Sequence, residues 1–206
     1  MATATKAPMP AFTGKYAQIR KDLYKGYAQK KYDPARSKYK TEAGFYKAQA
    51  NGFKKVMALI DKIESAGTLM EGQITIMWGT SQATATLDYY YIGPDGRMES
   101  KTVSGTRTNG WGYDKESTAF ANAAENSIEF MKILMDARAK KKDLGYGAAL
   151  NAGKPFLPHF NGGVGMNSIW DSMEKAGYKF KRIPTYNEDI QKYEFSIKRK
   201  PAVRRS

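Results

Sequence analysis

The sequence predicts an α+β protein in which helices pack on an antiparallel sheet. Three patterns support this fold class: apolar residues recur at helical spacing over 45–63, alternate with polar residues over 73–91, and return to helical spacing from 115 onward. A chain of 206 residues with 41% hydrophobic and 13% aromatic residues is long enough to bury a core. We therefore expect an α-β-β-β-α core with an antiparallel sheet, followed by a C-terminal helix and a β-hairpin.

Residues 1–42 are expected to form a basic arm rich in lysine and tyrosine. Residues 1–13 are small, contain proline and lack a pattern, as is typical of a disordered leader. Over residues 15–40, nine basic residues are interspersed with five tyrosines, and two aspartates oppose them. An apolar face predicts that part of the arm is a helix, which would end at Gly26 or at Asp33-Pro34. That face consists of Tyr16, Ile19, Leu23 and Tyr27.

Residues 43–142 are expected to form the core, which begins and ends with a helix. The first helix carries one apolar stripe from Phe45 to Ile63, and Gly67 is a natural C-terminal stop. The last helix is predicted as one long element over about 115–140, because apolar residues recur on a single face. Basic residues in its final turn suit the helix dipole.

Three antiparallel strands are expected between these helices. Polar and apolar residues alternate over 73–78 and 84–91, as is typical of strands with one buried face. The tetrapeptide at 93–96, Gly-Pro-Asp-Gly, has proline and glycine where a tight turn requires them. Residues 97–104 should therefore return as a third strand of a meander.

The C-terminal part of the chain is expected to add a linker and a small subdomain. Residues 143–160 are rich in glycine and proline and predict the linker. Residues 161–199 predict a short helix and a hairpin with strands at 178–183 and 190–198, which either extends the sheet or forms a winged-helix-like appendage. Residues 200–206 predict a basic tail.

The charge of the chain indicates an anionic partner. Lys and Arg total 34 against 20 acidic residues, which gives a net charge of +14, the electrostatic footprint of a polyanion binder. An acidic protein surface is the alternative partner. Three interpretations of the arm are open. Its cations would contact phosphates while its tyrosines stack on unpaired bases, its tyrosines would cover the apolar core, or the whole arm would dock on a partner protein. The side chains that we predict as nucleic-acid contacts are Lys15, Arg20, Lys21, Lys25, Lys30, Lys31, Arg36, Lys38, Lys40, Lys115, Arg138, Lys140, Lys141, Lys142 and Arg199.

No pattern in the sequence predicts a catalytic site, a metal site or a cofactor. The absence of cysteine excludes disulfides and thiolate chemistry. The single histidine, His159, excludes multi-histidine metal sites and is expected to be incidental. The carboxylates are scattered, so no magnesium site is expected. Neither a secretory signal nor a membrane span is apparent, and we expect a cytoplasmic protein.

Two glycine clusters, Gly110–Asp114 and Gly162–Asn167, each precede an expected helix. Helix N-termini expose unpaired N–H groups, and glycine lets a phosphate approach them, so each cluster would clamp a phosphate with help from Lys115, Asn167 or Ser168. The alternative is a sharp turn into a tightly packed helix. Because no Walker motif or complete dinucleotide fingerprint is present, we favour the alternative.

Tyr89, Tyr90 and Tyr91 form a further aromatic group on one expected strand. Their alternation places two rings on one face of the sheet and one ring on the other. They would form a stacking platform for bases or pack in the core, and we favour core packing for them and for Trp78 and Trp170.

The segment Gly110–Ala119, which reads GWGYDKESTA, and the later GGVGM with its helix and hairpin resemble a family of small phage and mobile-element proteins of Gram-positive bacteria. The resemblance covers about residues 72–197, and Trp111 departs from the glycine expected in that motif. It implies an accessory protein that acts on DNA or blocks host defence, as anti-CRISPR proteins do. The order helix, three strands, helix is also similar to the double-stranded-RNA-binding topology, but no residue is carried over from it.

We therefore expect a non-enzymatic nucleic-acid-binding protein of a phage or mobile element. Its Lys and Arg side chains would contact phosphates and read shape more than sequence. The alternative is an inhibitor of a host defence nucleoprotein complex that acts by protein docking. An enzyme with a hidden carboxylate site is the third and least favoured hypothesis.

Overall fold

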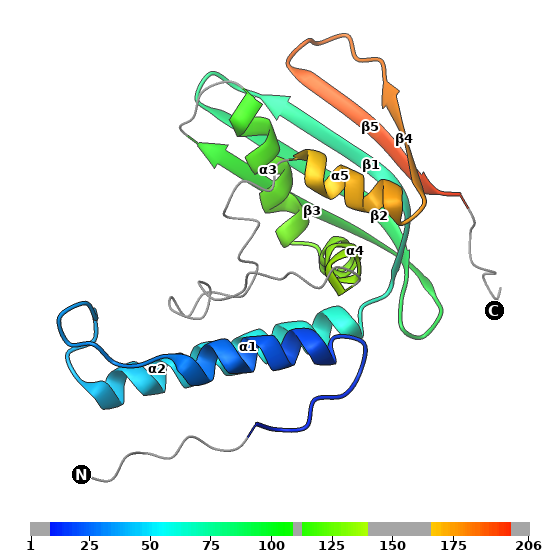
Figure 1. Cartoon of the computed structure of the whole chain (residues 1–206). Coiled ribbons are helices and arrows are strands. Elements are labelled where there is room, and N and C mark those ends of the chain that lie inside the picture. Colours follow the sequence, from blue (N-terminus) through cyan, green and yellow to red (C-terminus); the bar gives the residue numbers. More distant parts are fainter. Residues whose placement is uncertain (1–8, 109–112, 140–165, 199–206) are drawn as a thin grey trace. The chain divides into compact units, whose positions relative to one another are not determined.

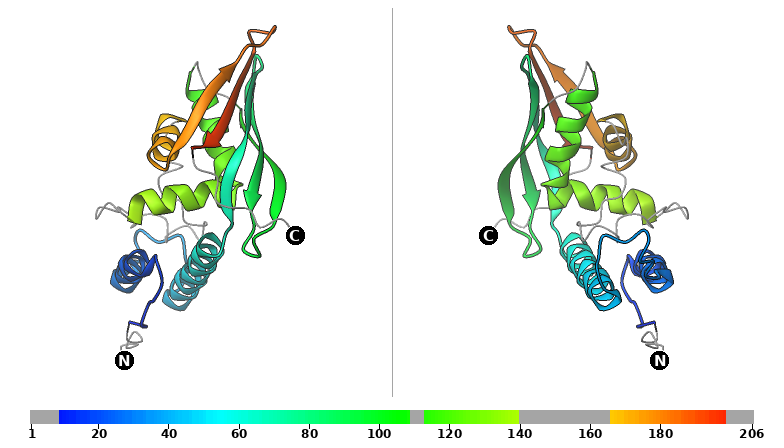
Figure 2. Two further views of the ribbon diagram at one scale, coloured as in Figure 1. Left: turned by 90° about the vertical axis from the view of Figure 1, so that its right-hand side faces the viewer. Right: turned by 90° about the vertical axis from the view of Figure 1, so that its left-hand side faces the viewer.

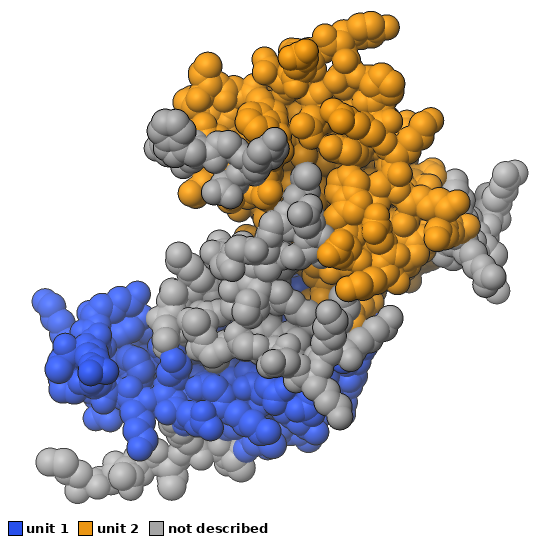
Figure 3. All heavy atoms as spheres, turned by 45° about the horizontal axis from the view of Figure 1, so that its top comes forward, with its two compact units in different colours: residues 1–64, 138–158 blue, residues 65–137, 159–206 orange. Residues whose placement is uncertain are grey.

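The computed structural model divides into two compact units, which are drawn in different colours in Figure 3. Unit 1 contains helices α1 and α2. Unit 2 contains a five-stranded sheet with α3, α5 and most of α4. The α+β class predicted from the sequence is thereby confirmed. The structure describes residues 9–108, 113–139 and 166–198.

Unit 1 is an antiparallel pair of helices, α1 (Ala17–Gln29) and α2 (Glu42–Glu64), that lie side by side in Figure 1. The direction follows from the contacts, because Arg20 near the start of α1 pairs with Asp61 near the end of α2. About two helical turns further on, Tyr27 stacks on Phe53 with 5.0 Å between ring centroids. Helix α1 continues through Gly26 and ends at Gln29, between the two ends predicted for it at Gly26 and at Asp33-Pro34.

The basic arm is thus part of a folded helical pair. Tyr16, Ile19 and Leu23 are buried, and they form the face that packs in unit 1. The buried stripe of α2 includes Phe45, Val56 and Ile60. Because these apolar faces belong to two neighbouring helices, α2 groups with α1. The predicted boundaries of 1–42 for an arm and 43–142 for a core divide the chain differently.

The sheet of unit 2 has the strand order β3-β2-β1-β5-β4, and every neighbouring pair is antiparallel. The C-terminal hairpin extends the sheet, because β5 pairs with β1 from Glu71↔Ser196 to Met77↔Ile190. The appendage alternative is therefore wrong. The strands are β1 (Thr68–Trp78), β2 (Gln82–Ile92), β3 (Met98–Thr108), β4 (Tyr178–Ile183) and β5 (Ile190–Ile197).

Helices α3 (Tyr113–Glu125), α4 (Ile128–Ala139) and α5 (Met166–Lys175) lie on one face of the sheet, as Figures 1 and 2 show. The single long helix predicted over 115–140 is wrong, because the chain breaks at Asn126 and Ser127. The Ser127 hydroxyl accepts a hydrogen bond from the Phe130 N–H at 3.2 Å, which caps α4. The Asn126 side chain donates to the Ser104 carbonyl at 2.8 Å and holds the break against β3.

Two glycines allow elements of unit 2 to approach closely. A Cβ added at Gly105 of β3 would overlap the backbone nitrogen of Ala123, so α3 packs on β3 through a surface without a side chain. A Cβ at Gly67 would overlap the carbonyl of Ile92. Gly67 was predicted to stop a helix, but α2 already ends at Glu64, and Gly67 instead permits contact with the end of β2.

The core of unit 2 lies between the sheet and its helices. The Phe130 ring lies 5.5 Å from the Tyr89 ring and 5.6 Å from the Phe195 ring, and both pairs meet edge to face. Trp170 of α5 stacks on Phe180 of β4 at 4.0 Å. The other face of β3 exposes hydroxyl side chains at Ser100, Thr102, Ser104 and Thr106.

Candidate functional site

The segment that joins α1 to α2 is held by hydrogen bonds of its own. The Asp33 carboxylate accepts from the Ala35 N–H at 2.9 Å, and the Asp33 carbonyl accepts from the N–H groups of Arg36 and Ser37. The Ser37 hydroxyl accepts from the Tyr39 N–H at 3.1 Å. These bonds fix residues 33–39 as an ordered turn before α2 begins.

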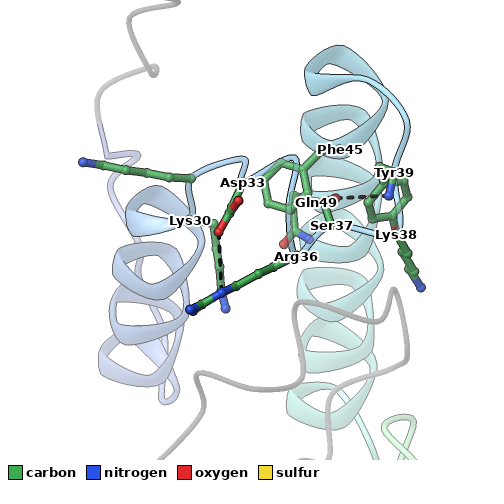
Figure 4. Close-up of a pocket in the computed structure, with 9 residues that line it drawn as sticks. Lys30, Asp33, Arg36, Ser37, Lys38, Tyr39, Phe45 and Gln49 are labelled. Atoms are coloured by element: carbon green, nitrogen blue, oxygen red, sulfur yellow. Dashed lines mark hydrogen bonds and ion pairs between the residues drawn. The ribbon is translucent and has the colours of Figure 1, made fainter.

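This turn and the first two turns of α2 enclose a hollow of about 660 Å³ on unit 1, shown in Figure 4. We call it the basic hollow, because four of the described residues that line it are cations and one is an acid. The acid, Asp33, lies 3.8 Å from the Arg36 guanidinium, whose side chain is 90% exposed. The lining residues are Lys30, Lys31, Asp33, Arg36, Ser37, Lys38, Tyr39, Phe45 and Gln49.

One wall of the basic hollow is aromatic. The buried Phe45 ring meets the Tyr39 ring edge to face at 5.9 Å and the Tyr32 ring at 5.7 Å. The Tyr32 hydroxyl donates to the Tyr39 carbonyl at 3.1 Å, which fixes the turn around Phe45. The Lys38 ammonium lies 5.4 Å from the centre of the Tyr39 ring, within the range of a cation–π interaction.

Gln49 is the polar residue in the depth of the hollow. It lies one helical turn after Phe45 on the buried stripe of α2, and its side chain and backbone together are 1% exposed. Within the part of the chain that the structure describes, its Oε1 atom is buried and has no hydrogen-bond partner. A buried carbonyl is normally paired, so an unpaired one in the lining of a hollow marks a position for a donor.

The predicted contact residues of the N-terminal segment separate into three groups. The first group, Lys30, Lys31, Arg36 and Lys38, lines the basic hollow. The second group lies outside its lining and consists of Lys15, Lys21, Lys25 and Lys40.

Arg20 forms the third group by itself, because its side chain is only 8% exposed and its guanidinium contacts Asp61 and Glu64 at 2.8 and 2.7 Å. A guanidinium buried between two carboxylates has little surface to offer a phosphate. We therefore interpret Arg20 as a structural residue, unlike the other cations predicted as contacts in this segment.

The other predicted contacts are not among the described residues that line the basic hollow. Lys115 is half-buried in the first turn of α3, which belongs to unit 2. Arg138 belongs to the last turn of α4. Lys140, Lys141, Lys142 and Arg199 lie outside the residues that the structure describes, as do His159 and the glycines of both predicted phosphate clamps.

The tyrosines have mostly structural surroundings. Tyr24 and Tyr27 pack against Phe53, and Tyr16 is fully buried. These rings therefore fit one of the three interpretations of the arm, in which its tyrosines cover the apolar core. Tyr89 is also buried, donates to Glu129 at 2.6 Å and shares a hydrogen bond of 2.7 Å with Ser127.

Tyr90 and Tyr91 differ from Tyr89 in exposure. Tyr90 is 50% exposed on the helix-free face of the sheet. Tyr91 donates to the Glu99 carboxylate at 2.6 Å, and this bond raises the pKa of its phenol to about 12. The two rings lie on opposite faces of β2, so the three tyrosines do not form one stacking platform.

The buried carboxylates of unit 2 do not converge. Burial raises the pKa of the Glu116 carboxyl, and a hydrogen bond from Trp78 opposes this shift. Burial also raises the pKa of Glu125, whose Oε1 atom has no partner in the described ranges 9–108, 113–139 and 166–198. Among those residues, no three His, Cys, Asp or Glu side chains are placed to hold a metal ion.

Comparison with known proteins adds no relative: no family model, no curated protein and no solved structure matches the chain. The resemblance to phage and mobile-element proteins therefore stays a prediction. No described helix is both long and apolar enough to span a membrane. The fold and the site together define an α+β protein that carries an ordered basic hollow on a helical pair.

Gln49 and the aromatic wall are the parts of the site that the sequence analysis missed. Phe45 was assigned to the core of the first long helix, and Gln49 was not singled out. A signal existed, because Gln49 occupies an apolar position of the stripe formed by Phe45, Gly52 and Val56. A polar residue at a core position of an amphipathic helix is a candidate for a specific hydrogen bond.

Proposed function

We propose that this protein binds nucleic acid through the basic hollow of unit 1. The observation that carries the proposal is that Lys30, Lys31, Arg36 and Lys38 line one hollow, in which Asp33 is the single carboxylate among the described lining residues. Phosphates are the anions that such a group of cations fits best, because each Lys or Arg replaces a counterion of the nucleic acid.

The ordered turn supports the proposal. Because hydrogen bonds that Asp33 and the Ser37 hydroxyl accept already hold residues 33–39, binding does not have to order this segment. Lys31, Arg36 and Lys38 are exposed, so their charged groups are accessible to a phosphate backbone. Contacts of this kind favour shape over sequence.

The charge of the surrounding helices supports it too. Residues 9–64 contain thirteen Lys and Arg side chains against five Asp and Glu. A surplus of this size attracts a polyanion over a distance of about 10 Å at an ionic strength of 0.1 M and raises its rate of association.

The test is fluorescence anisotropy with labelled single-stranded and duplex DNA and RNA at 50 and 200 mM salt. We expect affinity to fall steeply with salt. Replacing Lys31, Arg36 and Lys38 by Ala should make the slope of log affinity against log salt shallower by about 2 to 3, since each phosphate contact contributes about 0.7 to 0.9.

A matched control removes three charges from another exposed site. Lys179, Lys181 and Arg182 of β4 are exposed, and their replacement by Ala changes the net charge by the same amount. We expect the control to retain most of the affinity. Equal losses in the two triple variants would show that overall charge, and not the hollow, binds the nucleic acid. Failure of the wild-type protein to bind any of the four probes would refute the proposal.

A further inference from the structure

The basic hollow has two features that phosphate contacts alone do not use. The first is the unpaired Oε1 atom of Gln49, which is buried in the lining. The second is the aromatic wall of Tyr39 and Phe45, whose rings meet edge to face beside the cations. An acceptor without a donor and an aromatic surface together suit a flat ring that carries an N–H group.

The position of Gln49 also determines the side from which a donor can reach its carbonyl oxygen. Its carbonyl lies on the buried stripe of α2, because the side chain is almost fully buried one turn after Phe45. A donor that reaches Oε1 must therefore enter the hollow itself. A metal ion is a poor candidate, since the described lining residues include four cations and one acid, Asp33.

The size of the hollow limits the ligand. Pockets for small ligands commonly enclose about 300 to 1,000 Å³, and the basic hollow encloses about 660 Å³. One nucleotide fits this size, whereas a base pair inside a duplex offers neither its flat face nor its Watson–Crick edge to a hollow.

We propose that the basic hollow receives one nucleoside phosphate unit, either as a free nucleotide or as an unpaired nucleotide of a single strand. The base packs against Tyr39 and Phe45 and donates an N–H to Gln49 Oε1, and the phosphate lies among Lys31, Arg36 and Lys38. This proposal rests on the proposed function and adds to it a preference for unpaired nucleotides.

The experiment compares three labelled DNA probes of equal length: a single strand of adenines, the same strand with abasic sites, and the corresponding duplex. The two single strands carry the same charge, and the duplex carries twice as many phosphates. The proteins are the wild type, Gln49→Leu, and Gln18→Leu as a control for an exposed glutamine of α1. Competition by adenosine monophosphate distinguishes a free nucleotide from a nucleotide within a strand.

We expect the wild type to bind the adenine strand about tenfold more tightly than the abasic strand or the duplex. Gln49→Leu should lose about tenfold in affinity for the adenine strand and keep its affinity for the abasic strand. Gln18→Leu should match the wild type. Tyr39→Leu, which keeps the bulk of the wall but removes its ring, should show the same selective loss.

The outcomes separate the two proposals. Equal affinity of the wild type for all three probes, or an unchanged adenine-strand affinity in Gln49→Leu, would overturn the nucleotide site while leaving nucleic-acid binding intact. Absence of binding to every probe would overturn the proposed function as well. Strong competition by adenosine monophosphate would identify a free-nucleotide site, and weak competition a site for single strands.

Discussion

The guanidinium of Arg20 lies against the carboxylate of Asp61, with 2.8 Å between Nη2 and Oδ1, and so joins the start of α1 to the end of α2. Glu64 completes the contact at 2.7 Å and also accepts the Lys15 N–H at 2.6 Å. One buried cation thus holds the chain entry and both helices of unit 1 together.

Replacing Arg20 by Met should destabilise unit 1. The variant keeps most of the buried aliphatic stem but loses hydrogen bonds to two carboxylates, and we expect a loss of about 1 to 3 kcal/mol. Urea unfolding followed by far-ultraviolet circular dichroism measures it. Lys21→Met, one residue further on, should change stability by less than about 0.5 kcal/mol. An unchanged midpoint for Arg20→Met would show that the ion pairs do not stabilise the helical pair.

Gln49→Leu should make unit 1 more stable. The wild-type carbonyl is buried without a partner in the described part of the chain, and leucine removes that cost while filling a similar volume. We expect a gain of about 1 to 2 kcal/mol in the same unfolding experiment. A gain in stability with a loss of nucleotide affinity is the signature of a binding residue. A loss of stability would instead indicate that Gln49 serves the fold.

Gly105→Ala should disrupt the packing of α3 on β3. The added methyl group would overlap the backbone of Ala123, which cannot move without shifting the helix. We expect a destabilisation of about 1 to 3 kcal/mol or more, measured as a lower thermal midpoint. Ser104→Ala is the control, because Ser104 is exposed and its carbonyl bond with Asn126 does not involve the side chain. Equal midpoints for the two variants would contradict the close approach.

Glu125→Gln should stabilise unit 2 at neutral pH and not in acid. Burial raises the pKa of Glu125, so the folded state disfavours the charged carboxylate. This penalty is complete above the folded-state pKa and disappears as the pH falls toward the unfolded value of about 4.3. Unfolding free energies at pH 7 and pH 4 should therefore show a gain for the variant at pH 7 alone. A gain of the same size at both values would rule out titration as its cause.

The regular elements could be predicted because their signals are local. Alternation over β1 and β2 and the apolar stripe of α2 each repeat several times within one element. The break between α3 and α4 was missed because the apolar pattern continues on both sides of Asn126 and Ser127. Its cause includes the bond from Asn126 to Ser104, a residue 22 positions away, and no local pattern reports such a contact.

The candidate site could be predicted only in part. Lys31, Arg36 and Lys38 were identified from the density of charge, but so was Arg20, which the fold buries. Gln49 gave a weak signal as a polar residue on an apolar stripe. The hollow itself depends on the turn that Asp33 and Ser37 stabilise, and it could not be deduced from composition or spacing.

By itself, the sequence determined the α+β class, the strands and a basic surface, since periodicity and charge are properties of neighbouring residues. Only the tertiary structure decided that Arg20 is enclosed by Asp61 and Glu64 whereas Arg36 of the same basic segment is exposed at the hollow. The physical reason is that the exposure of a cation depends on the carboxylates and rings that distant segments bring to it.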